Sequence, residues 1–324
     1  MKFSRYSIGV DLGGTNVVVG ATRGNGRVVR LLKAPTGLSK SPTDVVGGIA
    51  ALISRLITDL GLERGLLTGV GVGVPGLVDA ENGIVRRSPN FVGWEDVPLS
   101  AMLEERICAP VVIDHDVRMI TRGEWAWGAG RGARNFICVT LGTGIGMGIV
   151  VDGRIYAGAH GNAGELGHVT ADLSGPRCGC GNLGCVEKLC AGPAIAEIAR
   201  KRIEEGAESA VSQLQDGRAN HIDAETVFRA AKLGDAIATS IIDTVCELLG
   251  SVIAGAVLML DPERVIVGGG IADAGDVLFD RLRAVVARRA YSYRLNNVTI
   301  VPWALGDKAG VLGAAHTVEM RRSM

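Results

Sequence analysis

Two similar segments, one close to the N-terminus and one near the middle of the chain, constrain the fold more than any other feature. Each contains two apolar, β-branched runs that flank a glycine-rich turn: Tyr6–Val10 and Val17–Thr22 around DLGGTN, and Asn135–Leu141 and Gly146–Val151 around the glycines of LGTGIGMG. Short runs of this kind joined by tight turns predict β-hairpins. The repetition predicts two halves that each begin with a strand, a glycine turn and a second strand.

The rest of the chain alternates between short strands and longer amphipathic helices. Further strands are expected at residues 28–33, 70–74, 111–113, 264–267 and 298–301, and helices at residues 44–60, 117–127, 244–260 and from about residue 308. Strands that alternate with helices are typical of α/β proteins. The length of 324 residues, of which 47% are hydrophobic, predicts two domains with large cores.

Composition argues against several classes of function. The chain has 34 basic and 34 acidic residues and a formal net charge of zero, which argues against a nucleic-acid-binding surface. Its longest apolar run, residues 248–260, is too short to span a membrane, and the N-terminal segment lacks the apolar core of a signal peptide. We therefore expect a cytoplasmic protein with no nucleic-acid partner and no membrane partner.

Both glycine turns are candidate phosphate-binding loops. In the first, the glycines after Asp11 allow backbone N–H groups to approach an anion, Thr15 adds a hydroxyl group, and Asp11 could hold a hydrated Mg²⁺. In the second, Thr143 supplies the hydroxyl group. The alternative is a pair of ordinary hairpin turns, but their matching positions favour phosphate binding. Neither is a P-loop, because no GK[ST] follows, and neither is a Rossmann fingerprint, because a strand follows.

A third glycine-rich segment, GGGI at Gly268–Ile271, follows the strand expected at residues 264–267. Its backbone could approach a nucleoside closely, because glycine has no Cβ atom. A simple strand-to-helix turn is the equally open alternative.

One imidazole and three thiols lie within the segment ELGHVTADLSGPRCGCGNLGCVE. They are His168, Cys178, Cys180 and Cys185, a recurring ligand set for structural, tetrahedral Zn²⁺. Buried thiols or a disulfide are the alternatives, but disulfides suit secreted chains, and a CxC pair is too close for an easy disulfide. Carboxylates flank the cluster at both ends, so a bound metal could hold them rigid for another purpose.

Taken together and in order, these motifs resemble the ROK (repressor, open reading frame, kinase) family of sugar kinases. The resemblance extends from Asp11 to about Gly313, and CGCGNLGCVE is its most specific part. It implies an α/β, two-lobed, actin-like or RNase-H-like ATPase fold with a zinc knuckle. The first lobe would comprise residues 1–122 with a C-terminal helix at about 306–324 returning to it, and the second lobe residues 123–305. The two lobes would close on a sugar and ATP, and family members are often homodimers or homotetramers.

The resemblance also implies roles for individual residues. Asp11 would position Mg²⁺ near the ATP phosphates, which would be cradled by Gly13, Gly14, Thr15, Gly142, Thr143 and Gly144. Gly269 and Gly270 would lie beside the adenosine. The sugar would be contacted by Gly76, Asn90, Glu165, His168 and Glu187, and the structural Zn²⁺ would be held by His168, Cys178, Cys180 and Cys185.

The catalytic base is expected in DHDVRMITRGE, where the family usually has ENDANAAALGE. Asp116 matches the catalytic aspartate, which would orient the attacking hydroxyl group and accept its proton. Asp114 is the alternative, although it could simply cap a helix or pair with an arginine. His115 and Arg118 stand where the family has asparagines, and Met147 stands where the family often has a glycine. Because His115 occupies a sugar-binding position, this departure affects the identity of the sugar more than the chemistry.

The predicted function is ATP-dependent phosphorylation of a hexose hydroxyl group, with glucose to glucose 6-phosphate as the first choice. Kinases of N-acetylmannosamine, N-acetylglucosamine, fructose or allose are alternatives within the family, and polyphosphate is an alternative donor. A sugar-binding protein without catalysis is the alternative of another class. A repressor is not expected, because the helix-turn-helix domain of such members would precede the first glycine motif.

Overall fold

The computed structural model describes residues 5–37, 41–88, 90–214, 222–291 and 298–322. The chain divides into two compact units. Unit 1 comprises Met1–Gly132, Arg154–Ala163 and Ala304–Met324, and unit 2 comprises Ala133–Gly153 and Gly164–Trp303. The sequence-based limits placed residues 123–132, 154–163 and 304–305 in the second lobe, whereas all of them belong to unit 1.

The sheet of unit 1 has the strand order β3-β2-β1-β4-β8. The strands are β1 (Tyr6–Leu12), β2 (Asn16–Thr22), β3 (Val28–Pro35), β4 (Leu67–Val74) and β8 (Val111–His115). The first three form an antiparallel meander, and β4 and β8 run parallel to β1. The hairpin and the strands predicted here from β-branched runs are therefore present.

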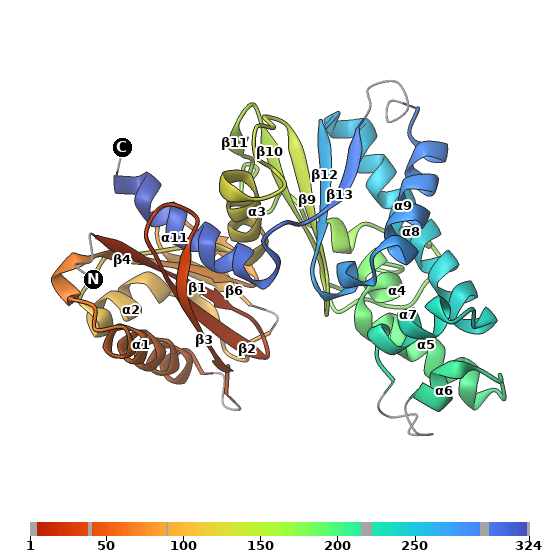
Figure 1. The fold of residues 1–324 in the computed structure, drawn as a ribbon, viewed down its shortest axis with the longest axis horizontal. Helices are drawn as coiled ribbons and strands as arrows, with labels where there is room; N and C mark the ends of the chain where they lie inside the picture. Colours follow the sequence, from red (N-terminus) through yellow and green to blue (C-terminus); the bar gives the residue numbers. More distant parts are fainter. Residues whose placement is uncertain (1–4, 38–40, 89, 215–221, 292–297, 323–324) are drawn as a thin grey trace. The chain divides into compact units, whose positions relative to one another are not determined.

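Helices cover both faces of this sheet (Figure 1): α1 (Pro42–Asp59) and α2 (Leu99–Ile107) on one, and α3 (Asp116–Trp127) and α11 (Ala309–Arg322) on the other. Helix α11 packs directly on the strand backbones, since a Cβ atom on Gly9 would lie 1.8 Å from the carbonyl oxygen of Val311. Glycine is thus required in β1 for the predicted return of the C-terminal helix to the first unit. A small sheet of β5 (Leu77–Asp79), β6 (Ile84–Arg87) and β7 (Glu95–Val97) completes unit 1, and the sequence did not predict it.

Unit 2 repeats the arrangement of unit 1. Its strands β9 (Phe136–Leu141), β10 (Ile145–Val151), β12 (Arg264–Gly268) and β13 (Thr299–Pro302) lie in the order β10-β9-β12-β13. Strand β10 is antiparallel to β9, and β12 is parallel to both β9 and β13. This order and these directions match β2-β1-β4-β8, so the repetition predicted from the two glycine hairpins is confirmed. The two-residue strand β11 (Arg154–Ile155) follows β10 along the chain.

Most helices of unit 2 pack around one long, apolar helix, α8 (Ala236–Leu260), whereas α6 (Ala210–Leu214) packs on α7 (Ala224–Lys232). The others are α4 (Val186–Cys190), α5 (Gly192–Glu204) and α9 (Asp276–Arg289), with single 3₁₀ turns η2 (Leu166–His168) and η4 (Gly270–Ala274). By length and hydropathy alone α8 could cross a membrane, but 56% of its most apolar window is buried inside the unit. Its apolar character is therefore explained by its position in the core of unit 2. It begins earlier than predicted, because Asp235 caps its first turn.

A buried carboxylate holds two of the segments next to which the chain passes between the units. Glu124, at the end of α3, has 0% exposure and accepts hydrogen bonds from the backbone N–H groups of Ala129, Ala304 and Leu305 at 2.7, 3.0 and 2.8 Å. Two of the four crossings of the chain between the units lie next to these segments, at 132/133 and 303/304. One side chain thus fixes the backbone next to both crossings.

Candidate functional site

The first glycine loop of unit 1 is a closed turn fixed from outside. The N–H of Gly13 donates to the carbonyl oxygen of Asn16 at 2.9 Å. Thr36, just after β3, donates its hydroxyl group to the carbonyl oxygen of Gly13 at 2.7 Å and its N–H to that of Thr15 at 2.9 Å. The side chain of Thr15 remains exposed. The loop is therefore rigid and keeps a hydroxyl group available, as phosphate binding requires.

Asn90, predicted to contact the sugar, lies beside this loop. A Cβ atom on Gly14 would lie 3.2 Å from the Cβ atom of Asn90. Gly76, also predicted beside the sugar, packs against the neighbouring segment, since its Cβ atom would lie 2.2 Å from the carbonyl oxygen of Arg87. The structure thus shows a packing reason for the glycine at position 76 and brings Asn90 to the phosphate-loop candidate.

Asp11 ends β1 beside two other acidic side chains. Burial, chiefly, and the negative charges of Asp116 and Asp307 together raise the pKa of the Asp11 carboxyl to about 7. A Cβ atom on Gly310, in the first turn of α11, would lie 2.7 Å from Oδ2 of Asp11. Carboxylates that disfavour one another's charge in this way suit a divalent cation, and Mg²⁺ prefers carboxylate oxygens with water. Sequence reasoning missed Asp307 and Gly310, which lie outside every recognised motif.

Asp116 is the first residue of α3, directly after β8. Its Oδ1 atom accepts a hydrogen bond from the N–H of Val117 at 2.7 Å and lies 3.1 Å from Nδ1 of His115. Among the described residues, its Oδ2 atom has no partner, and a quarter of the side chain is exposed. The carboxylate is therefore held by one oxygen and offers the other, as a base that accepts a hydroxyl proton must.

Asp114, the alternative base, is occupied in a buried ion pair. It is 5% exposed, and its Oδ1 atom accepts hydrogen bonds from the N–H of His115 at 2.8 Å and from Nε of Arg118 at 2.6 Å. Arg122 approaches Oδ2 of Asp114 at 3.4 Å, and Arg118 also donates to the carbonyl oxygen of Gly161 at 2.7 Å. Asp114 therefore pairs with an arginine, which is one of the two structural roles that the sequence left open for it. The i,i+4 spacing of Asp114 and Arg118 was a signal that could have found the pair.

The second glycine loop belongs to unit 2 and is held by Glu187. Oε2 of Glu187 accepts a hydrogen bond from the N–H of Ile145 at 2.9 Å, and a Cβ atom on Gly144 would lie 2.7 Å from the same oxygen. The N–H of Gly142 donates to the carbonyl oxygen of Gly144 at 3.0 Å, and Thr143 is exposed. Glu187, predicted only as a sugar contact, therefore also fixes the loop. Its second carboxylate oxygen remains for another partner.

The GGGI segment lies next to this second loop. Gly269 has a φ of +89°, and a Cβ atom there would lie 2.3 Å from the carbonyl oxygen of Leu141, the last residue before the loop. Gly270 opens η4. Two segments predicted to bind the nucleotide, far apart in the sequence, are thus neighbours in unit 2.

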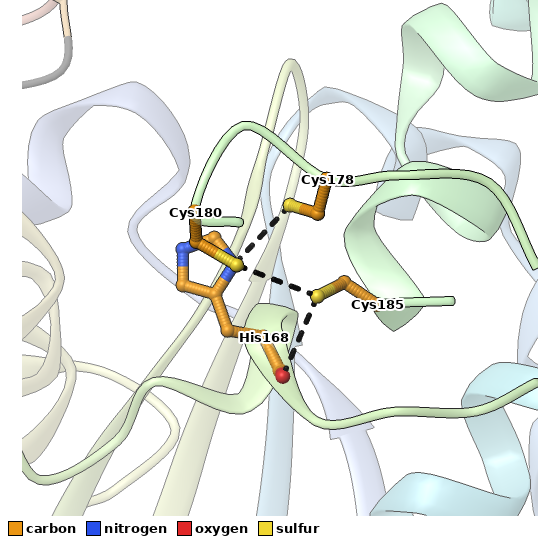
Figure 2. A group of neighbouring side chains, drawn as sticks. All are labelled: His168, Cys178, Cys180 and Cys185. Atoms are coloured by element: carbon orange, nitrogen blue, oxygen red, sulfur yellow. Dashed lines mark hydrogen bonds between the residues drawn. The ribbon is translucent and has the colours of Figure 1, made fainter. Parts of the chain in front are cut away.

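The predicted zinc ligands converge on one point (Figure 2). The candidate ligand atoms of His168, Cys178, Cys180 and Cys185 all lie within 4.8 Å of one another. Nδ1 of His168 lies 3.7 Å from Sγ of Cys178, and Sγ of Cys180 lies 3.6 Å from Sγ of Cys185. Ligands of a tetrahedral zinc with bonds of about 2.3 Å are about 3.8 Å apart, so this donor set fits Zn²⁺. The S···S separation is far too long for a disulfide.

Electrostatics within the cluster also favour a cation. Burial, chiefly, and the neighbouring thiols of Cys180 and Cys178 together raise the pKa of the Cys185 thiol to about 12. The pKa of Cys180 is lowered, chiefly by a hydrogen bond from the backbone of Asn182. Three thiols this close cannot all ionise without a positive charge between them, whereas a metal deprotonates coordinating thiols. The group therefore has the chemistry of a metal site.

The cluster connects directly to the flanking carboxylates. Cys185 immediately precedes α4, whose first turn contains Glu187. His168 turns Nδ1 toward the thiols, while its Nε2 atom lies 3.9 Å from Oε2 of Glu165. A metal in this group would thus hold the elements that carry Glu165 and Glu187, both predicted to contact the sugar.

Comparisons with known proteins agree with this geometry. The ROK family model matches residues 7–321. A glucokinase of Thermotoga maritima is 38% identical to the chain over 97% of each sequence. The crystal structure of a ROK family glucokinase from Streptomyces griseus, in complex with glucose and AMPPNP, is 32% identical and superimposes with a TM-score of 0.86, covering 97% of this chain and 99% of that one. The xylose repressor of Bacillus subtilis is 28% identical over 98% of this chain and 78% of the repressor.

Proposed function

The chain belongs to the ROK family, and on that premise we propose that it is an ATP-dependent sugar kinase that converts glucose to glucose 6-phosphate. The observation that carries the proposal is the carboxylate of Asp116. It lies at the start of α3, and its Oδ1 atom accepts a hydrogen bond from the N–H of Val117, while Oδ2 has no partner among the described residues. Its negative charge also raises the pKa of Asp11, near the end of β1. A base beside a second carboxylate suited to Mg²⁺ is the arrangement that phosphoryl transfer to a hydroxyl group needs.

In the proposed reaction, Oδ2 of Asp116 orients the 6-hydroxyl group of the sugar. The hydroxyl oxygen forms a bond to the γ-phosphorus as the bond from that phosphorus to the ADP oxygen breaks, and the hydroxyl proton passes to Asp116. Most of the rate then comes from positioning and from charge stabilisation by backbone N–H groups. Mg²⁺, held by Asp11 through water, would neutralise charge on the phosphates.

The two glycine loops are proposed to hold the phosphates, each within its own unit. Gly13, Gly14 and Thr15 act in unit 1, and Gly142, Thr143 and Gly144 act in unit 2, with Gly269 and Gly270 beside the adenosine. The rigid turns around Gly13 and Gly142 support this role, because donors fixed before binding need no reorganisation during the reaction.

For the sugar, we propose contacts from Gly76, Asn90, His115 and Asp116 of unit 1 and from Glu165, His168 and Glu187 of unit 2. Zn²⁺ at the Cys3His group is proposed to be structural: it would hold His168 and, through Cys185, the turn that carries Glu187. A cytoplasmic homodimer or homotetramer is the proposed form of the protein.

The test is ADP release by the purified protein with Mg-ATP across glucose, mannose, fructose, allose and the N-acetylhexosamines, with polyphosphate as a second donor. We expect turnover with glucose. Asp116→Asn should retain glucose binding, measured by calorimetry, and lose most of kcat, because a positioned base contributes about 10²–10⁴. Asp114→Asn is the matched control, with a smaller loss of kcat. Glucose binding without any product from the unchanged protein would favour a sugar-binding protein instead.

A further inference from the structure

The carboxylate of Glu187 binds the second glycine loop through one oxygen and leaves the other unbound. Its Oε2 atom accepts a hydrogen bond from the N–H of Ile145 at 2.9 Å, whereas its Oε1 atom has no partner among the described residues. The side chain is partly buried, so Oε1 is within reach of a ligand. The proposed function assigns this residue to the sugar, and its bond to the loop still lacks a role in the reaction.

The loop that Glu187 holds has backbone donors without partners. The N–H of Gly142 donates to the carbonyl oxygen of Gly144, but the N–H groups of Thr143 and Gly144 have no partner in the described part of the chain. Successive backbone N–H groups of this kind form concave sites for anions. The N–H of Ile145, bound by the carboxylate, is the next in the row. Glu187 therefore fixes one end of the row of donors that a phosphate group would use.

Backbone surrounds the bound carboxylate oxygen closely. Cβ atoms on Gly144 and on Gly167 of η2 would lie 2.7 and 3.3 Å, respectively, from Oε2 of Glu187. Just after α4, the N–H of Gly192 donates to the carbonyl oxygen of Gly142 at 2.8 Å. The loop is thus held at its first residue from the end of α4 and just beyond its last from the start of α4. A movement of Oε2 would meet the loop backbone, so the position of this side chain and that of the loop depend on each other.

We propose, building on the kinase function above, that Glu187 is a positioning residue that couples sugar binding to nucleotide binding. A sugar hydroxyl group that donates to Oε1 fixes the torsions of the side chain, and with them Oε2 and the row of N–H groups. The nucleotide then binds to a loop that is already ordered. Because the second ligand loses less conformational entropy than it would alone, each ligand strengthens the binding of the other.

The second flanking carboxylate, Glu165, provides a matched control. It is also proposed to contact the sugar, and its Oε2 atom lies 3.9 Å from Nε2 of His168. Among the described residues, no hydrogen bond or ion pair joins its side chain to the loop at 142–145. Loss of this carboxylate should therefore weaken sugar binding and leave the coupling intact.

The first test is calorimetry of glucose binding to the full chain, with and without Mg²⁺ and AMPPNP, an ATP analogue that does not readily transfer its phosphoryl group. We expect the nucleotide to lower Kd for glucose by about tenfold, and glucose to lower Kd for the nucleotide by the same factor. In Glu187→Leu this factor should fall below about twofold, and in Glu187→Gln, whose amide oxygen can still accept from Ile145, it should be intermediate. Glu165→Gln should raise Kd for glucose and keep the full factor.

The coupling factor distinguishes this role from a purely structural one. A substitution that only loosened the loop would weaken nucleotide binding equally with and without glucose, and the factor would stay the same. An unchanged factor in Glu187→Leu, or no coupling in the unsubstituted protein when it binds both ligands, overturns the proposal.

The second test needs no variant. Glucose alone, without nucleotide, should slow hydrogen exchange of the N–H of Ile145 by about tenfold, measured by nuclear magnetic resonance, while the amides of α9 should exchange as before. Bound glucose that leaves exchange at Ile145 unchanged refutes the coupling. Failure of the kinase function is a different result, since it would show as no product from any sugar. Product formation with a coupling factor of one would refute this inference alone.

Discussion

Glu124→Gln tests how unit 1 holds two of the segments next to which the chain passes between the units. The carboxylate is fully buried, and its oxygens accept from the N–H groups of Ala129, Ala304 and Leu305 at 2.7–3.1 Å. Among the described residues it has no cationic partner, so these backbone groups are what stabilise it. An amide of the same shape has only one accepting oxygen. Its NH₂ group must therefore face at least one backbone N–H group.

The expected loss follows from two terms. A bond to a charged acceptor becomes a donor–donor contact, which leaves a buried N–H group unsatisfied and costs about 1–3 kcal/mol. The bonds that remain lose their charge assistance, and charge-assisted bonds are about twice as strong as neutral ones, so roughly 1 kcal/mol more is lost. We expect the free energy of unfolding of unit 1 to fall by about 2–4 kcal/mol.

Urea unfolding followed by tryptophan fluorescence measures this loss, because Trp125 and Trp127 lie beside Glu124 in α3. The two units need not unfold together, so the transition that these tryptophans report is the relevant one. Glu104→Gln is the matched control: Glu104 is exposed and accepts one backbone bond, from Val111 at 2.8 Å. The control should lose less than about 1 kcal/mol. If Glu124→Gln loses no more than the control, the backbone bonds are not what stabilises this region.

Three further perturbations have definite expected outcomes. Cys180→Ser should lack zinc, as measured by metal analysis. It should also raise KM for glucose more than it lowers kcat, because Glu187 follows Cys185, a proposed zinc ligand. A zinc-free protein with an unchanged KM would contradict this. Asp235→Ala should destabilise unit 2 by about 1–2 kcal/mol at pH 7, as loss of a helix cap does. Burial raises the pKa of the Asp235 carboxyl, but hydrogen bonds from the backbone at the start of α8 outweigh it and lower the pKa. This stabilisation is therefore present at neutral pH and should disappear as the pH falls below about 4 in unfolding curves. Gly9→Ala should cost about 1–3 kcal/mol or more in denaturant unfolding, because its Cβ atom would collide with α11, while Gly48→Ala, with open space around it in α1, should be neutral or stabilising.

The repeated hairpins could be predicted because their signal is local. Alternating β-branched residues on either side of a glycine turn specify a hairpin without reference to the rest of the chain. The small sheet β5-β6-β7 could not, because strands of three or four residues show too little alternation to stand out. Residues 154–163 belong to unit 1 although unit 2 precedes and follows them in sequence. No local sequence pattern indicates that a short segment between two parts of unit 2 belongs to unit 1.

The candidate site divides in the same way. The four residues of the Cys3His group were predictable as a set, because a short spacing and the chemistry of thiols leave few other arrangements, and the structure brings all four together. The family assignment and the kinase activity that it implies were predicted from the motifs and are confirmed, while the roles of single site residues stay predictions. Glu187 was assigned by motif to the sugar, but its bond to the N–H of Ile145 depends on a contact between distant segments.

The departures from the family pattern show where motif reasoning ends. At position 115 the motif predicts a sugar contact and therefore treats histidine as a change of specificity. The structure also places Nδ1 of that histidine 3.1 Å from Oδ1 of Asp116, a contact set by the turn between β8 and α3. Arg118 departs from the motif too, and it forms a buried ion pair with Asp114, the alternative base. A motif compares positions one at a time. When the side chains at two positions contact each other, their role depends on both residues. Only the geometry then shows whether the two residues contact the substrate, the base or the backbone that carries the base.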